Sequence, residues 1–206
     1  MNTREILDIL SKMRQKMEEE KDFLTELDNA IADGDHGINM ARGFGVLEQK
    51  LAGFEDKDIG TVLKTAGMSL VSAVGGSAGP LYGTAFMKAG MVMAGKTEMD
   101  LNGFLVCLKA AVDGIMMRGR AVRGEKTMLD AMIPALEAME KANAEGKTAK
   151  ETLGLGVAAA KEGVEFTKTI PATKGRASYI GERSIGHQDP GATSFTDLLE
   201  VVEDAL

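Results

Sequence analysis

Apolar residues recur every three or four positions along almost the whole chain, the spacing that places them on one face of an α-helix. Ile6, Leu10, Met13 and Met17 show this pattern in the first segment. No alternation of apolar and polar residues is long enough to predict a β-strand. The pattern predicts helices over residues 6–17, 23–27, 36–47, 59–74, 82–93, 101–115, from 127 onward, 148–166 and 195–202.

Short connections between these segments indicate that neighbouring helices run antiparallel. The 206 residues include 25 glycines but only 4 prolines, and 44% of them are hydrophobic, enough to bury a sizeable core. We therefore expect an all-α protein in which residues 1–206 form a single domain, an antiparallel bundle or closed barrel of about eight helices.

Two connections do not follow the helical pattern. Residues 119–126, GRAVRGEK, are glycine-rich and basic, and residues 167–191 have no helical period and contain two prolines. A connection as long as the second is usually a lid, a binding loop or a disordered segment. Its mixture of Ser178, Tyr179 and Ile180 with charged residues is too varied for a simple linker. We expect it to cover a binding site.

Charge and cysteine content narrow the functional classes. With 24 Lys and Arg against 31 Asp and Glu the formal charge is −7, which disfavours nucleic acid and anionic membranes as partners. The single cysteine, Cys107, lies in an apolar run and is interpreted as a core residue. The charged N-terminus has no signal-peptide core, and no apolar run is long enough to span a membrane. We expect a soluble, cytoplasmic protein.

The stretch LDNAIADGDHGINM, residues 27–40, brings Asp28, Asp33 and Asp35 together within eight residues. Clustered carboxylates repel one another unless a cation lies between them, and carboxylate oxygens suit Mg²⁺ or Ca²⁺. The spacing does not match an EF-hand, whose loop needs further acids at fixed positions. Mg²⁺ completed by phosphate oxygens fits better. The alternative is a set of solvated helix caps, because Asp-Gly pairs are common in turns.

A second stretch, VGGSAGPLYG at residues 74–83, lies between two predicted helices. Its glycines free the backbone, and N–H groups at the start of a helix bind phosphate well. It lacks the Gly-Lys-Ser/Thr of a Walker A loop, and a small-residue junction needed only for packing is an equal alternative. The two histidines, His36 beside the carboxylates and His187 in the long connection, are further candidates for a phosphate ligand, an acid–base group or a phosphoryl acceptor. A plain hydrogen-bonding role is the alternative for His187.

Four motifs together resemble one protein family. They are LDNAIADGDHGINM, GGSAGPLYG, KTMLDA (residues 126–131) and GRASYIGERSIGHQDPGATS (residues 175–194). They resemble the nucleotide-binding L subunits of dihydroxyacetone kinases over almost the whole chain. That resemblance implies a barrel of eight antiparallel helices with the nucleotide site at one end, which agrees with the helical periodicity.

The resemblance also implies site residues. Asp28, Asp33 and Asp35 would hold two Mg²⁺ ions that bridge the phosphates of ADP or ATP, and no catalytic residue is expected beyond this metal–nucleotide site. The expected nucleotide-binding residues are His36, Gly37, Ile38, Asn39, Ser77, Ala78, Gly119, Thr127, Met128, Arg176, Asp189, Pro190 and Gly191.

Two branches of the family differ in their phosphoryl donor. A stand-alone L chain of this kind resembles the branch that keeps ADP as a coenzyme, receives a phosphoryl group from a phosphohistidyl protein of the phosphotransferase system, and passes it to dihydroxyacetone on a separate K subunit. Some L subunits also contact a transcription regulator, which is a further expected partner. The alternatives are a kinase that uses free ATP, including one for fatty acids, and a non-catalytic nucleotide-sensing module. In the fatty-acid kinases a Thr replaces the residue that corresponds to His36.

Overall fold

The computed structural model describes residues 1–206, which form nine α-helices and one 3₁₀-helix, η1. There is no β-strand, only an isolated bridge between Asn2 and Glu98, so the all-α prediction is confirmed. None of the helices is both long and apolar enough to cross a membrane. The elements are α1 (Thr3–Glu19), α2 (Lys21–Ile31), α3 (His36–Leu51), α4 (Ile59–Ala73), α5 (Ala78–Val92), α6 (Leu101–Gly119), α7 (Leu129–Ala144), α8 (Ala149–Thr167), η1 (Arg176–Ser184) and α9 (Pro190–Asp204).

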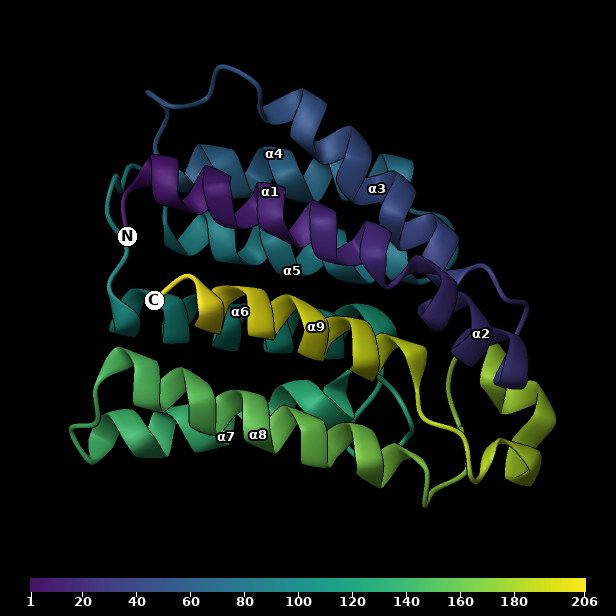
Figure 1. The fold of residues 1–206 in the computed structure, drawn as a ribbon. Coiled ribbons are helices and arrows are strands. Elements are labelled where there is room, and N and C mark those ends of the chain that lie inside the picture. Colours follow the sequence, from purple (N-terminus) through teal and green to yellow (C-terminus); the bar gives the residue numbers. More distant parts are fainter.

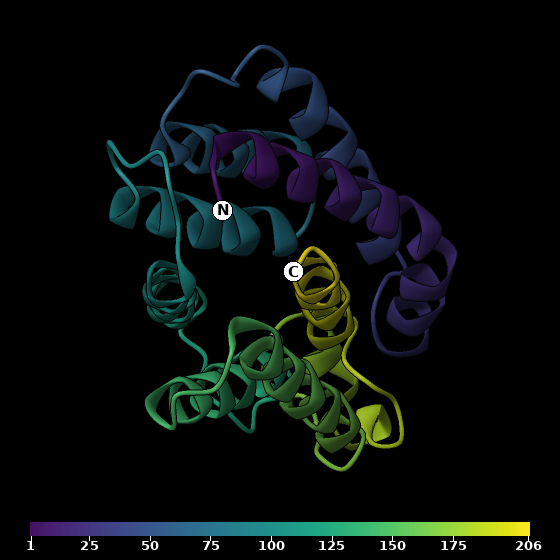
Figure 2. The same ribbon diagram turned by 60° about the vertical axis from the view of Figure 1, so that its left-hand side comes forward.

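Eight of the helices close into a ring (Figures 1 and 2). From α3 to α9 each helix packs against the next in the chain; α1 packs against α3 at one side and against α9 at the other, which closes the ring. Helix α2 lies at one end of the barrel, in contact with η1 (Figure 1). The predicted barrel of about eight antiparallel helices is confirmed.

The up-and-down path gives the two ends of the barrel different characters. Helices α1, α4, α6 and α8 start at the end that carries both chain termini, and α3, α5, α7 and α9 start at the end near α2 and η1 (Figure 1). Every helix start carries backbone N–H groups without intrahelical partners and a positive dipole end. Four such starts therefore lie at the α2 end.

The structure of the connection after α8 differs from the prediction. Sequence periodicity predicts no helix between residues 167 and 191, yet residues 176–184 form η1 and α9 begins at Pro190, five residues earlier than predicted. A 3₁₀-helix repeats every three residues, and η1 is interrupted at Gly181, whose φ of 54° is non-helical, so no 3.6-residue period arises. Ala172 and Ala177 pack with Ile31 of α2 in a small apolar cluster, which anchors this segment.

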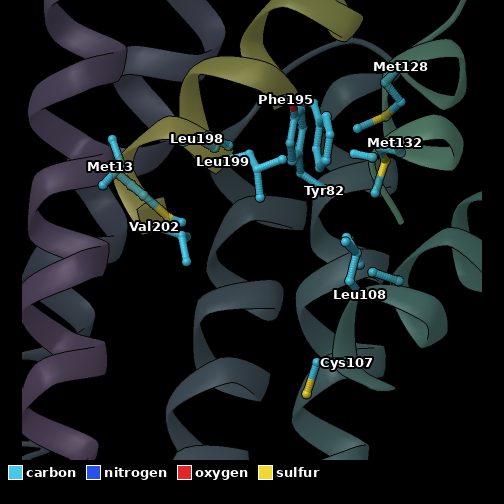
Figure 3. Close-up of a cluster of buried hydrophobic side chains, with 14 of the residues drawn as sticks. Met13, Tyr82, Cys107, Leu108, Met128, Met132, Phe195, Leu198, Leu199 and Val202 are labelled. Atoms are coloured by element: carbon cyan, nitrogen blue, oxygen red, sulfur yellow. The ribbon is translucent and has the colours of Figure 1, made fainter. Parts of the chain in front are cut away.

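Most buried apolar side chains form one continuous cluster inside the ring. Within it lies a cavity of about 160 Å³ lined only by hydrophobic residues. Figure 3 shows Phe195 and Leu199 of α9, Tyr82 of α5 and Met132 of α7 around this space. Cys107 is buried in its wall, as predicted, and burial raises the pKa of its thiol to about 11.

Helices α7 and α8 approach each other closely at Gly163. A methyl group on Gly163 would lie 2.1 Å from the carbonyl oxygen of Asp130 and 2.8 Å from the Cα of Ala131, both backbone atoms that cannot rotate away. Nearer the start of α8, a methyl group on Gly154 would meet only the flexible end of Glu203, at 3.0 Å. Close packing of α7 and α8 therefore requires a glycine at position 163, but not at position 154.

We expect Gly163→Ala to lower the free energy of unfolding by about 1–3 kcal/mol or more, because the two helices must separate. Gly154→Ala is the matched control on the same helix, and it should be neutral or stabilising by up to about 1 kcal/mol, because alanine is the better helix former. Urea unfolding followed by circular dichroism measures both. Equal losses in the two variants would contradict close packing at Gly163.

Candidate functional site

A polar cavity of about 420 Å³ lies at the end of the barrel where α3, α5, α7 and α9 begin. Its wall includes the residues at all four helix starts: Asp35 and His36, Ser77 and Ala78, Met128 and Leu129, Asp189 and Pro190. The cavity thus collects the positive ends of four helix dipoles, an environment that favours an anion.

At three of these four helix starts the N-cap residue itself, Asp35, Ser77 or Met128, makes no side-chain cap. The first N–H groups of α3 and α7 instead donate to Asp28 Oδ2 and Thr127 Oγ1, at 3.2 and 3.3 Å, whereas no side chain accepts from the first turn of α5. At the opposite end of the barrel, all four helices are capped by side chains, namely Asn2, Asp58, Asp100 and Thr148. The N–H groups at the start of α5 are therefore left free for a ligand.

The three aspartates converge on one wall of the cavity. Carboxylate oxygens of Asp28, Asp33 and Asp35 lie within 4.8 Å of one another. Gly34, with φ of 71°, makes the turn between α2 and α3 that brings them together. Asp28 Oδ2 accepts hydrogen bonds from the backbone N–H groups of Asp35 and His36, at 2.9 and 3.2 Å, which fixes its orientation.

The charges of this cluster are poorly balanced by the protein itself. Burial raises the pKa of Asp28, and the nearby Asp33 and Asp35 raise it further, against the effect of the two N–H donors. Arg176 is the cation that faces the cluster, with Nη1 2.8 Å from Asp33 Oδ2. Three carboxylates against one guanidinium leave a negative excess of hard oxygen donors, so the residues present fit Mg²⁺.

The glycine turn before α5 lies opposite the carboxylates. Gly76 has φ of 62°, and a methyl group on it would point toward Asp35 Oδ1 at 3.9 Å, with nothing else near. The uncapped start of α5 follows directly at Ser77 and Ala78. Carboxylates and free N–H groups thus face a shared space, an arrangement suited to a metal-bound polyphosphate.

A buried hydrogen-bond network joins His36, Tyr82 and Ser194 beside the carboxylates. Nε2 of His36 and the hydroxyl of Tyr82 lie 2.9 and 2.8 Å from Oγ of Ser194, which itself donates to the carbonyl oxygen of Gly191 at 3.2 Å. Burial lowers the pKa of His36 to about 4, so its ring is neutral at pH 7. Burial also raises the pKa of Tyr82. The network joins the starts of α3 and α9 to α5.

Basic side chains also line the cavity. Arg118 at the end of α6, and Lys174 and Arg176 before and within η1, all line it. Lys174 Nζ lies 3.7 Å from Glu125 Oε1. Asp189, which also lines the cavity, caps α9 by accepting the N–H of Ala192 at 2.7 Å, and burial raises the pKa of its carboxyl to about 7.

All but two of the predicted site residues line this single cavity. The exceptions are Gly37 and Ile38. Gly37 packs against α2, where a methyl group would lie 2.0 Å from the carbonyl oxygen of Lys21, and the side chain of Ile38 is 50% exposed outside the cavity. His187 is exposed and does not line the cavity either.

Sequence reasoning missed Arg118, Lys126 and Lys174. The basic character of residues 119–126 pointed to this region but not to these side chains. It also missed Ser194, whose role depends on a contact across 158 residues of sequence that no local pattern reveals.

Comparison with known proteins identifies the family. The model of the DAK2 domain matches residues 30–204. The chain belongs to the DAK2 domain family. A DAK2 relative, the ADP-binding subunit DhaL of the PEP-dependent dihydroxyacetone kinase of Escherichia coli K12, is 39% identical over 198 residues, 96% of this chain and 94% of the relative. The corresponding ADP-binding subunit of a PTS-dependent dihydroxyacetone kinase from Lactococcus lactis is 40% identical, with 94% of each chain covered.

Solved structures agree with this DAK2 fold. The crystal structure of the dihydroxyacetone kinase of C. freundii in complex with AMP-PNP and Mg²⁺ superimposes on all of this chain with a TM-score of 0.75 at 22% sequence identity. The present chain spans 34% of that longer protein. At this level of identity the comparison establishes the barrel fold.

We expect Ser194→Ala to lower the free energy of unfolding by about 1–3 kcal/mol, because His36 and Tyr82 would each lose a buried hydrogen-bond partner. Thr196→Val is the matched control on α9, since the buried Thr196 hydroxyl donates only to the carbonyl oxygen of Ala192 within its own helix. Urea unfolding of both variants measures the difference. A loss no larger for Ser194→Ala than for Thr196→Val would show that the network contributes nothing.

Proposed function

We propose that this chain is the ADP-binding L subunit of a dihydroxyacetone kinase that uses a phosphohistidyl donor. In this role it keeps ADP or ATP bound with two Mg²⁺ ions as a coenzyme, and passes the phosphoryl group to dihydroxyacetone held on a separate K subunit. The observation that carries the proposal is the polar cavity in which three aspartates face the uncapped start of α5. The names of the relatives support the choice of nucleotide and substrate.

Asp28, Asp33 and Asp35 are the residues that would hold Mg²⁺. When bound, the metal neutralises charge on the phosphates during transfer. The N–H groups at the start of α5, beside Ser77 and Ala78, would bind phosphate oxygens, and Arg176 would add a guanidinium suited to the same oxygens. These groups are positioned before the ligand arrives, so little reorganisation accompanies transfer.

The remaining predicted residues would surround the rest of the nucleotide. In the proposal, His36 and Asn39 lie beside the metal site, and Gly37 and Ile38 belong to the same turn although they do not line the cavity. The base, ribose and covering contacts are assigned to Gly119, Thr127, Met128, Asp189, Pro190 and Gly191, which all line it. The ring of His36 is neutral at pH 7, and its Nε2 is hydrogen-bonded to Ser194 Oγ. His36 therefore serves as a positioning group and not as a phosphoryl acceptor.

The proposed partners follow from this role. A K subunit would supply the dihydroxyacetone pocket, and a phosphohistidyl protein of the phosphotransferase system would supply the phosphoryl group. The relatives named PEP-dependent and PTS-dependent, which this chain matches over nearly their full length, support that donor over free ATP. A cytoplasmic location, where these partners would be found, and contact with a transcription regulator belong to the same proposal.

Asp33→Asn removes one charge of the proposed metal site while nearly keeping the side chain's shape. We expect the affinity for Mg-ADP, measured by calorimetry, to fall by about 1–3 kcal/mol, as for loss of a charge-assisted contact. Asp33 is exposed and lies outside the core, so the fold should be retained. The control is Asp22→Asn, an exposed acid on α2 outside the cavity.

Metal removal tests the same site without mutation. Mg-ADP should raise the melting temperature of the wild-type chain, because it binds the folded state only, and EDTA should abolish that increase. An Asp33→Asn variant that binds Mg-ADP as tightly as wild type would show that the carboxylate cluster is not the metal site.

The division of labour between subunits gives the decisive test of function. The isolated chain should bind ADP or ATP but phosphorylate no dihydroxyacetone, because the proposal assigns the dihydroxyacetone pocket to the K subunit. Addition of the K subunit to the ATP-loaded chain should give about one turnover per bound nucleotide, and the phosphohistidyl donor with phosphoenolpyruvate should restore continuous turnover. Continuous turnover with free ATP and no donor protein would instead identify an ATP-dependent kinase.

A further inference from the structure

Lys126 is a buried lysine at the edge of the polar cavity. Its side chain is only 1% exposed. The ammonium donates to three backbone carbonyl oxygens, those of Thr167 at 2.6 Å, Ile170 at 3.4 Å and His187. An ammonium has three protons, so these carbonyls use its full donor capacity. None is left to bind a phosphate oxygen.

The backbone of Lys126 is in an unfavourable conformation. Its φ of 59° lies in the left-handed region, where side chains are rarely found and glycine is the usual residue. Burial also opposes its charge and lowers the pKa of the ammonium, although Asp189 and Asp130 lie near enough to raise it in part. A lysine that is both strained and desolvated persists only where its side chain is needed.

The three carbonyls lie at or beside the two ends of one segment, residues 168–189, which we name the covering segment. Thr167 is the last residue of α8 and directly precedes the segment, Ile170 is the third residue of the segment, and His187 lies two residues before Asp189, the N-cap of α9. The covering segment contributes Lys174, Arg176 and Ala177 to the cavity wall. Lys126 itself belongs to the connection between α6 and α7, so it joins this segment to a different part of the barrel.

The ends of the covering segment are also tied to each other. The N–H of Asp189 donates to Thr167 Oγ1 at 2.9 Å, and the N–H of Gly186 donates to the carbonyl oxygen of Lys168 at 2.8 Å. These bonds close the segment into a loop but do not fix it to the start of α7. The Lys126 ammonium reaches both ends of the loop at once.

We propose that Lys126 is a positioning residue that fixes both ends of the covering segment to the start of α7 and thereby sets how long the bound nucleotide is retained. This inference rests on the proposed function, in which a coenzyme must stay bound between successive phosphoryl transfers. Without the ammonium, the carbonyls of Thr167 and His187 lose a shared donor. The middle of the segment is still held by the apolar cluster with Ile31, the Arg176–Asp33 ion pair and the contacts of Thr173 and Lys174 with Glu125, but its two ends are loosened, so it moves away from the cavity more often.

The main test is Lys126→Met, which keeps an unbranched apolar side chain as far as Cε and removes only the ammonium. The release of a fluorescent ADP analogue, displaced by excess Mg-ADP, should become at least ten-fold faster. Hydrogen exchange measured without nucleotide should rise in residues 168–189 and stay unchanged elsewhere. Lys126→Gly removes the ammonium and also relieves the backbone strain. If Lys126→Met fails to fold, nucleotide release and hydrogen exchange are compared between Lys126→Gly and wild type instead.

Two controls separate positioning from general stability. Lys168→Met removes a lysine of the covering segment that only makes an exposed ion pair with Glu165, and it should leave both measurements at the wild-type level. Met139→Ala opens the core on α7 beside Gly156, away from the covering segment, and should lower the melting temperature without selective exchange in residues 168–189.

Wild-type exchange and release in both Lys126 variants would overturn the proposal. Faster exchange with unchanged release would overturn it as well, because Lys126 would then support the fold alone. If the wild-type chain failed to retain the analogue, the proposed function would be wrong, whereas the exchange comparison, made without nucleotide, would still decide whether Lys126 holds the segment.

Discussion

The up-and-down path of the chain obliges every second helix of the ring to begin at the same end, and the site depends on this constraint. Four positive dipole ends meet around one cavity, and the first-turn N–H groups of α5 have no side-chain partner there. A cap typically contributes about 1 kcal/mol, so the uncapped start of α5 forgoes stability of that order. All four helix starts at the opposite end of the barrel are capped by their own N-cap residues, which indicates that the open start of α5 belongs to the site and not to the fold as such.

The carboxylates complement these helix starts. Free N–H groups attract an anion, and Asp28, Asp33 and Asp35 would repel the same anion unless a cation lies between them. The two features are compatible only with a ligand that brings both charges, such as a polyphosphate with its divalent metal. Either feature alone has an ordinary structural explanation, as a set of solvated caps or a packing junction. Their placement across one cavity is what favours nucleotide binding.

Sequence periodicity was sufficient for the helices and their antiparallel order, because a ring of amphipathic helices repeats the same pattern in every element. It failed for η1, where a three-residue repeat interrupted at Gly181 leaves no such signal. Most of the cavity wall was predictable from motifs, although these placed Gly37 in it where the structure shows helix packing. Lys126 and Ser194 were not predictable as site residues, because their partners lie 41 to 158 residues away in sequence.

The floor of the site separates two very different environments. Tyr82 and Met128 line both the polar cavity and the apolar cavity inside the ring. The ring of Tyr82 contributes to the apolar interior, while its hydroxyl is held by Ser194, which also contacts His36 beside the carboxylates. A buried polar group without a partner is costly, so this network keeps the Tyr82 ring in place between the two cavities. Burial also lowers the pKa of His36 and keeps its ring neutral at pH 7. The ring therefore adds no charge to a site that already has helix dipoles and basic side chains. The apolar core therefore affects the polar site by holding His36, at the start of α3, in place and in its neutral form.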